Sequence, residues 1–310
     1  MEPKSIVITG ATGFIGSNIA SFFTNQKLRV SALVRKESDL TKLPSTENLR
    51  TFCYQKLNEK KLIDFLIKQK PDIFIHCAWK GVDGESRNKD NQINFNIPFT
   101  LSSVELASKV GCIHWIGFGS QAEYGNHYQA IDEKTPLKPY TAYGKSKLAA
   151  GVAALKLCEQ KEIMGSWLRL FSVFGPYDRS NSFISYLITE LLDGRSPNIT
   201  KCEQIWEYLY VDNLAEAILC MTKKDVCGVF NIGSGDAKVL KDFLKIVRGM
   251  IKNSPQPNFG VRQYRNDQVM HLCADISKIT KMTGWKPTVS FQEGILSTIN
   301  FLKTTQVSSH

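Results

Sequence analysis

A glycine-rich turn between the first strand pattern and the first helix pattern constrains the fold most. In ITGATGFIGSNIA, Gly10, Gly13 and Gly16 follow a short apolar run and open an amphipathic stretch. Glycines at these positions permit a tight turn, close approach of the backbone to a pyrophosphate and close helix–sheet contact, and the helix N-terminus favours an anion. An ordinary glycine-rich turn is the alternative, but both flanks fit a strand and a helix. The turn therefore predicts a dinucleotide-binding site.

Short apolar runs alternate with amphipathic stretches along the first 175 residues. The runs are rich in β-branched and aromatic residues and cover 6–10, 30–34, 72–78, 113–120 and 167–175. Helix patterns occupy 15–26, 59–69, 96–109 and 144–159. Strands alternating with such helices predict an α/β fold with a doubly wound parallel sheet, whose ligands bind beyond the carboxyl ends of the strands.

The alternation loosens after Gly175 and Pro176. We expect residues 1–175 to form mainly the nucleotide-binding domain and residues 176–310 mainly a smaller substrate-binding domain. Segments near 205–235 are expected to return to the first domain, because no linker-like stretch separates the two parts.

Composition narrows the classes of partner and cofactor. The chain has 310 residues, of which 43% are hydrophobic, and a formal net charge of +10. Its basic residues are spread along the chain, which indicates a solvated surface and no nucleic-acid partner. Eight cysteines and five histidines show no ligand spacing, so no metal is expected. No apolar run is long enough for a bilayer and no signal-peptide pattern is present, so we expect no membrane partner and a cytoplasmic location.

The end of the second strand pattern predicts which nicotinamide cofactor binds. An Asp or Glu there would bond both hydroxyls of the adenine ribose of NAD. This position holds Val34, followed by Arg35 and Lys36, and two cations suit the 2′-phosphate of NADPH better than a bare diol. The sequence therefore favours NADPH over NAD. The alternative is that both cations are surface residues at the start of a loop.

A tyrosine and a lysine lie one helical turn apart in TAYGKSKLAAGVAALKL. Tyr143 and Lys147 are at i and i+4, with Cβ atoms expected about 5–6 Å apart on one face of a helix. A phenol has an ordinary pKa of about 10, and a neighbouring ammonium together with an oxidised nicotinamide would lower it. Ser120, at the end of an expected strand, would bond the substrate oxygen that Tyr143 protonates. We predict these three as the catalytic residues.

The sequence resembles the extended short-chain dehydrogenase/reductase family, specifically its nucleotide-sugar epimerases, dehydratases and ketoreductases. The resemblance covers nearly the whole chain, through GATGFIG, NIPFTLSSVELA, YGKSK, LRLFSVFGP, EYLYVDNLAEAI, FNIGSG and ADISKITKMTGWKPTVSFQEGI. It implies a Rossmann domain that holds the cofactor and a smaller C-terminal α/β domain that holds a nucleoside-diphosphate sugar. It also implies a homodimer paired through the helices expected at 96–109 and 144–159.

The resemblance also assigns individual site residues. Asn96 matches the structural asparagine of the family and Arg265 the arginine that binds the sugar diphosphate. Trp79 follows a strand end and is either a sugar contact or part of the loop packing. The expected cofactor contacts are Gly10, Thr12, Gly13, Phe14, Ile15, Gly16, Arg35, Lys36, Leu57, Ala78, Asn96, Tyr143, Lys147 and Phe171. The expected substrate contacts are Trp79, Ser120, Ser172, Trp206 and Arg265.

Three positions depart from the family pattern. Ser172 stands where the family often has an asparagine near the substrate phosphate, and Trp206 replaces a frequent arginine at the nucleotide end. The third strand ends in YQKL, so Lys56 takes the place of an aspartate that contacts the adenine. The base of the substrate nucleotide therefore stays open.

The residues after Ser120 separate the reactions of the family. Sugar 4,6-dehydratases carry an Asp-Glu pair there, because elimination of water needs an acid and a base besides the tyrosine. Gln121 and Ala122 can exchange no proton, which argues against a dehydratase. Glu123 lies one position further on, and strand alternation would aim it to the opposite side from Ala122.

A ketoreductase is the favoured reaction. SQAEYG is similar to the strand end of reductases that act on 4-keto-6-deoxy nucleotide sugars, and a reductase consumes NADPH at each turnover. The expected reaction reduces C4 of a dTDP- or CDP-linked 4-keto-6-deoxyhexose and gives a 6-deoxysugar donor for surface polysaccharide. The alternatives are an NAD-dependent 4-epimerase of nucleoside-diphosphate hexoses and a non-catalytic cofactor-sensing protein.

Overall fold

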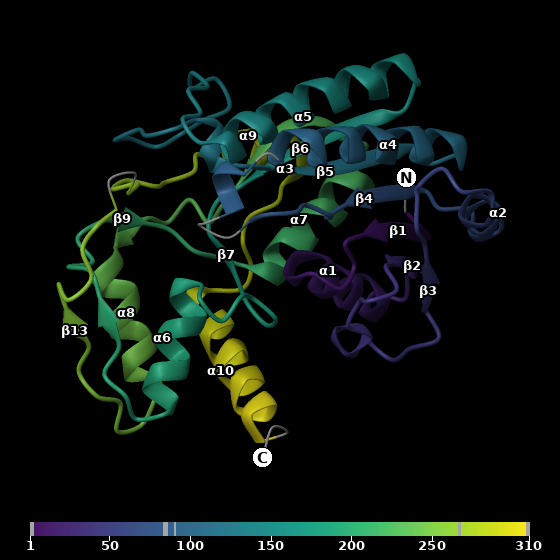
Figure 1. Ribbon diagram of the computed structural model, residues 1–310. Coiled ribbons are helices and arrows are strands. Elements are labelled where there is room, and N and C mark those ends of the chain that lie inside the picture. Colours follow the sequence, from purple (N-terminus) through teal and green to yellow (C-terminus); the bar gives the residue numbers. More distant parts are fainter. Residues whose placement is uncertain (1–2, 83–85, 90, 266–267, 308–310) are drawn as a thin grey trace.

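The computed structural model describes residues 3–82, 86–89, 91–265 and 268–307. Its centre is a parallel sheet of seven strands, and helices lie on both of its faces (Figure 1). In sheet order the strands are β11 (Gly228–Ile232), β6 (Met164–Leu170), β5 (His114–Ser120), β4 (Ile73–His76), β1 (Ser5–Thr9), β2 (Arg29–Val34) and β3 (Leu49–Cys53). This is the strand order of a doubly wound Rossmann-like sheet, so the α/β fold predicted from the sequence is confirmed.

The four helices expected from the sequence are present, with ends that differ by at most two residues. They are α1 (Phe14–Asn25), α2 (Lys60–Gln69), α4 (Asn96–Lys109) and α5 (Ala142–Gln160). The other helices are α3 (Asn91–Asn94), α6 (Phe183–Leu192), α7 (Val211–Lys223), α8 (Leu240–Gly249), α9 (Ser277–Thr283) and α10 (Phe291–Val307), with single 3₁₀ turns η1 (Leu40–Lys42), η2 (Ser86–Asn88) and η3 (Gln121–Glu123). Within the described ranges, no helix is both long and apolar enough to cross a membrane.

One stretch expected as a single strand, 167–175, is two strands. β6 ends at Leu170, and the two-residue strand β7 (Val173–Phe174) pairs with β10 (Leu209–Tyr210) outside the main sheet. The chain turns between them at Ser172, whose φ of +29° lies in the left-handed region. Apolar residues flank Ser172 on both sides, so the sequence pattern does not mark this turn.

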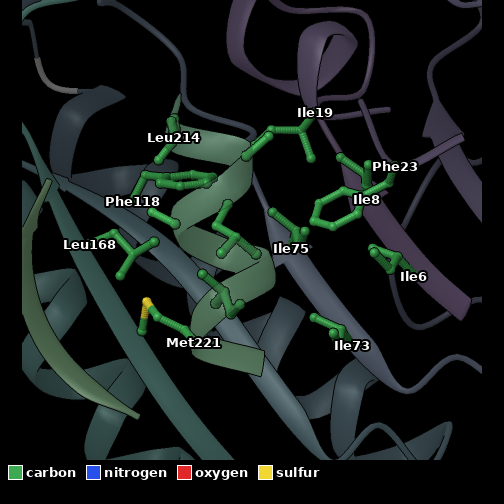
Figure 2. Packing of buried hydrophobic residues seen from close by; sticks show 14 of the residues in the cluster. Ile6, Ile8, Ile19, Phe23, Ile73, Ile75, Phe118, Leu168, Leu214 and Met221 are labelled. Carbon is green, nitrogen blue, oxygen red and sulfur yellow. The ribbon is translucent and has the colours of Figure 1, made fainter. Parts of the chain in front are cut away.

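The core on one face of the sheet lies between the strands and helices α1 and α7. Alternate residues of β1 and β4 point to this side. Figure 2 shows Ile8 of β1 beside Phe23 of α1, and Phe118 and Leu168 of the neighbouring strands beside Leu214 and Met221 of α7. Residues of α1 in this core thus fix the helix that follows the glycine turn. Burying one such side chain stabilises the fold by about 1.5–3 kcal/mol.

The other face is covered by α2, α4 and α5. Val7 and Phe74, which alternate with the isoleucines of the first core, contribute to this second cluster. Two tryptophans, Trp115 of β5 and Trp167 of β6, stack with ring centroids 6.2 Å apart beneath α4 and α5. This packing fixes α5, and therefore Tyr143 and Lys147, relative to the end of β5.

A smaller lobe is formed by α6, α8 and α10 (Figure 1). The segments 205–235 divide between the lobes: β11 joins the main sheet beside β6, and α7 packs on α1. In the smaller lobe, short strands pair as β8 (Asn198–Ile199) with β13 (Asn258–Phe259) and β9 (Ile205–Trp206) with β12 (Lys238–Val239).

Candidate active site

A pocket of about 1260 Å³ opens at the carboxyl ends of β1, β2, β3 and β4 and runs along α4. The glycine turn forms part of its wall, and Gly10 has a φ of +66°. A Cβ at Gly10 would lie 2.7 Å from the backbone nitrogen of Ala78, so only glycine fits between the two strand ends. The expected cofactor residues that line the pocket are Gly10, Thr12, Gly13, Arg35, Leu57 and Ala78. Trp79, expected as a substrate contact, lines the pocket as well.

The other expected cofactor residues lie outside this lining. Phe14, Ile15 and Gly16 form the first turn of α1, and a Cβ at Gly16 would overlap the carbonyl oxygen of Gly10. Tyr143 and Lys147 lie on α5. The other three are the exposed Lys36, the fully buried Phe171, and Asn96, whose amide bonds the backbone nitrogen and oxygen of Lys80 at 2.9 and 3.0 Å.

Cations gather where the pocket reaches the end of β2. Val34 is buried, while Arg35 and Lys56 line the pocket. Ser38 lines it too, and its hydroxyl accepts a hydrogen bond from the backbone nitrogen of Arg35 at 2.9 Å. Sequence reasoning missed Ser38, although a serine three residues after Arg35 is a recognisable turn signal. Burial raises the pKa of the nearby Tyr54 to about 12, and the charge of Arg35 opposes this shift.

Ser120, Tyr143 and Lys147 come together at the end of β5. Thr141 caps α5 by accepting a hydrogen bond from Gly144 at 3.1 Å, which places Tyr143 in the first turn. The hydroxyl of Ser120 accepts a hydrogen bond from the backbone nitrogen of Ala122 at 3.2 Å, and it lies near enough to the Tyr143 phenol to lower the pKa of that phenol. Lys147 Nζ donates to the carbonyl oxygen of Phe118 at 2.7 Å and lies 5.8 Å from the centroid of the Tyr143 ring.

Burial dominates the acid–base properties of this group. It raises the pKa of Tyr143, while the charge of Arg87 and the hydroxyl of Ser120 oppose the shift. Burial also lowers the pKa of Lys147 to about 7. The protein alone therefore holds the phenol above its ordinary pKa, and the lowering expected from the sequence would have to come from the bound cofactor.

Glu123 is a structural acid behind Ser120. Its side chain is fully buried and accepts hydrogen bonds from the Ser120 backbone nitrogen (2.9 Å), Trp167 Nε1 (2.9 Å) and Arg169 Nε (2.8 Å). Strand alternation does not explain this orientation, because Gln121–Glu123 is the 3₁₀ turn η3. The carboxylate folds back on its own N-cap residue and is paired with Arg169, which the sequence did not reveal.

Trp79 lines the pocket and also contacts Tyr143 and Lys147. Its ring is 6.2 Å from that of Tyr143 in an edge-on contact, and Lys147 Nζ lies 3.6 Å from the Trp79 ring centroid. Its indole donates to Gln92 Oε1 at 2.9 Å, and Gln92 Nε2 in turn bonds the carbonyl oxygen of Ser86 at 3.0 Å. Gln92 is fully buried, and no local sequence pattern marks it.

The expected substrate contacts from the smaller lobe are spread out. Ser172 occupies the turn between β6 and β7, and Trp206 lies half-buried in β9. Arg265 is exposed and follows Tyr264. The hydroxyl of Tyr264 accepts a hydrogen bond from the backbone nitrogen of Glu203 at 3.0 Å. The structure thus brings Trp79 and Ser120 to Tyr143, and places the other three on separate elements.

The strand order, the glycine turn and the serine–tyrosine–lysine group define the class of this protein. The sequence model of the NAD dependent epimerase/dehydratase family matches residues 6–233, and the chain belongs to this family.

Individual relatives are more distant. The chain is 21% identical to the CDP-abequose synthase of Salmonella muenchen, over 94% of this chain and 96% of that protein. Its fold is similar to the UDP-N-acetylglucosamine 4-epimerase of Methanobrevibacter ruminantium (TM-score 0.87, 23% identity, 98% of this chain and 100% of the other). It is also similar to the UDP-glucuronic acid 4-epimerase of Bacillus cereus in complex with UDP-glucuronic acid and NAD (TM-score 0.80, 23% identity, 97% and 99%).

Proposed function

We propose that this protein is an NADPH-dependent 4-ketoreductase of nucleotide sugars. Its substrate is a dTDP- or CDP-linked 4-keto-6-deoxyhexose, and its product is a 6-deoxyhexose donor for surface polysaccharide. In this proposal residues 1–175 mainly bind the cofactor and residues 176–310 mainly bind the substrate, with the segments near 205–235 returning to the first domain.

The cationic end of the pocket carries the proposal. Arg35 and Lys56 line the pocket beside the buried Val34, where an enzyme that retains NAD would carry a ribose-binding acid. Among the described residues, the carboxylate that lines the pocket is that of Glu105, which is paired with Lys161 at 2.9 Å. A guanidinium suits a phosphate because it donates in a fixed fork, and each charge-assisted bond contributes about 1.5–3 kcal/mol.

The residues beside Ser120 support a reduction over an elimination. Gln121 and Ala122 carry no titratable group, and both Glu123 oxygens accept hydrogen bonds from buried donors. Tyr143 is thus the acid–base side chain at this strand end. A carbonyl reduction needs one proton donor, whereas loss of water needs a second acid–base pair.

The catalytic residues have distinct roles in this reaction. NADPH would supply the hydride for C4. Tyr143 donates a proton to the C4 oxygen, and Ser120, whose hydroxyl acts on the pKa of the phenol, holds that oxygen. Lys147, next to the Tyr143 ring, would hold the nicotinamide ribose.

A cofactor and substrate panel tests the proposal. The protein should consume NADPH with dTDP- or CDP-4-keto-6-deoxyglucose, and Tyr143→Phe should remove nearly all of this activity. Arg35→Ala should raise the KM for NADPH by roughly 10–100-fold, the equivalent of one lost charge-assisted bond, and leave NADH use unchanged. Arg50→Ala, an exposed arginine on β3, is the matched control. Absence of NADPH consumption with every keto-sugar would sink the proposal.

An NAD-dependent 4-epimerase is the second candidate. It is favoured by the similar fold of the Bacillus cereus UDP-glucuronic acid 4-epimerase, whose structure contains NAD. Such an enzyme would be purified with bound NAD and would interconvert C4 epimers of a nucleoside-diphosphate hexose without added cofactor. Dependence on added NADPH would exclude it.

We also propose that the chain forms a homodimer through α4 and α5. These helices pack side by side on one face of the sheet, and Val152 of α5 is 64% exposed. Light scattering should give twice the mass of one chain, and Val152→Lys should shift the protein toward the monomer.

A further inference from the structure

Arg87 lies on the face of the Tyr143 ring, although it comes from a different part of the chain. Its Cζ atom is 4.6 Å from the ring centroid, a distance at which a guanidinium is attracted to an aromatic face. Arg87 Nε is buried and has no hydrogen-bond partner among the residues that the structure describes. Among the described residues, the nearest group that we find for this charge is therefore the face of the phenol ring.

The turn that carries Arg87 is tied to the start of α5. Asn88 Oδ1 accepts a hydrogen bond from the backbone nitrogen of Ala142, the residue before Tyr143, at 3.1 Å. On the other side, Gln92 holds the carbonyl oxygen of Ser86 at 3.0 Å. The first bond joins η2 to α5 and the second joins it to α3, so the fold sets the position of Arg87 over the ring.

Charged groups reach Tyr143 from several elements. Glu123, at the end of η3, raises the pKa of Tyr143, whereas Arg179, which precedes α6, lowers it. Lys147, on α5 itself, is 5.8 Å from the ring. Burial lowers the pKa of Lys147 to about 7, so near neutral pH its ammonium is only partly charged. A guanidinium keeps its charge over the whole working range of pH. The charge of Arg87 is the main influence that lowers the pKa of Tyr143 against the rise caused by burial.

We propose that Arg87 is a positioning residue for the reaction: its guanidinium stabilises the phenolate that remains when Tyr143 has given its proton away. A cation on the ring face favours the anionic ring over the neutral one, both by charge attraction and because the phenolate is richer in electrons. The consequence for catalysis rests on the proposed function. The effect on the phenol itself needs no substrate.

A titration of the Tyr143 phenol tests this directly. Protein labelled with ¹³C at the tyrosine ring is titrated by NMR without substrate, and the Tyr143 signal is identified by its loss in Tyr143→Phe. Arg87→Gln should raise the midpoint by about one pH unit, as expected for removal of an opposite charge within about 6 Å. Arg87→Lys should give a clearly smaller rise. Lys89→Gln, which removes an exposed charge two residues away, should leave the midpoint unchanged.

Arg87→Met, which has no charge but a long side chain, repeats the test if the glutamine variant folds poorly. An unchanged midpoint in the neutral variants would overturn the proposal, as would a rise in Arg87→Lys as large as in Arg87→Gln. A wild-type phenol that stays protonated at every pH at which the protein is folded would also overturn it. Because the readout needs no turnover, a failure of the ketoreductase proposal leaves this test intact.

Discussion

Replacing Glu123 by glutamine distinguishes a structural acid from a catalytic one. The glutamine amide has nearly the same shape, and its oxygen can keep the bonds from the Ser120 nitrogen and the Trp167 indole. Its NH₂ group then faces Arg169 Nε, now 2.8 Å from the carboxylate, so that two donors meet. The Arg169 side chain is only 6% exposed and would lose its counter-charge.

The expected loss of stability follows from this burial. Removing one partner of a buried ion pair costs about 3–5 kcal/mol, because the other charge is left without compensation. For a chain of this size, about 2 °C of melting temperature corresponds to each kcal/mol, so the melting temperature should fall by roughly 6–10 °C. The matched control is Glu159→Gln. Glu159 pairs with Lys156 at 2.7 Å, but both side chains are exposed, and the change should stay below about 0.5 kcal/mol.

Urea denaturation followed by near-ultraviolet circular dichroism measures the free energy of unfolding of the three proteins. In parallel, kcat is measured per folded molecule with the substrate that the panel identifies. We expect Glu123→Gln to lower kcat by less than about tenfold, because loss of a general acid or base costs about 10²–10⁴-fold. A stability loss below about 1 kcal/mol, well under the cost of an unpaired buried charge, would refute the reasoning. A hundredfold loss of kcat at unchanged stability would do so as well.

Three further predictions concern the glycine turn, Lys147 and the break between β6 and β7. Gly16→Ala should weaken NADPH binding at least tenfold and destabilise the fold by about 1–3 kcal/mol, because its Cβ overlaps Gly10; calorimetry checks both effects. Gly249→Ala, with no atom within 4 Å of the new Cβ, is the control. Burial lowers the pKa of Lys147 to about 7, against about 10.4 in the unfolded chain. Between these values the unfolded state binds the extra proton, so stability rises with pH, by up to about 1.4 kcal/mol per unit. Lys147→Met should remove this slope in urea titrations at pH 7 to 10, and a slope that persists would contradict the assignment. Ser172→Asn should stabilise the protein by about 0.5–1 kcal/mol in the same assay, since asparagine tolerates the left-handed region better; a loss of stability would show that φ is not the limiting factor.

Local patterns predicted much of the fold. The alternation of apolar runs and helix patterns gave α1, α2, α4 and α5 to within two residues, because each buries a continuous face. The residues of β3 were not among the predicted apolar runs, because its sequence LRTFC is largely exposed at the sheet edge. The break at Ser172 was missed because apolar residues flank it on both sides, so the sequence pattern does not mark the end of β6.

The sequence by itself determined the glycine turn and the choice of Ser120, Tyr143 and Lys147. Each of these depends on residues close together in the chain: the spacing of three glycines, one helical turn between a phenol and an ammonium, and a serine at the end of an apolar run. Only the tertiary structure decided what surrounds them. Arg169 reaches Glu123 from 46 residues away, and Arg87 lies over Tyr143 from a separate turn. Such contacts arise where strand ends and loops converge at one edge of the parallel sheet, and neither residue carries a local pattern that distinguishes it from a surface arginine.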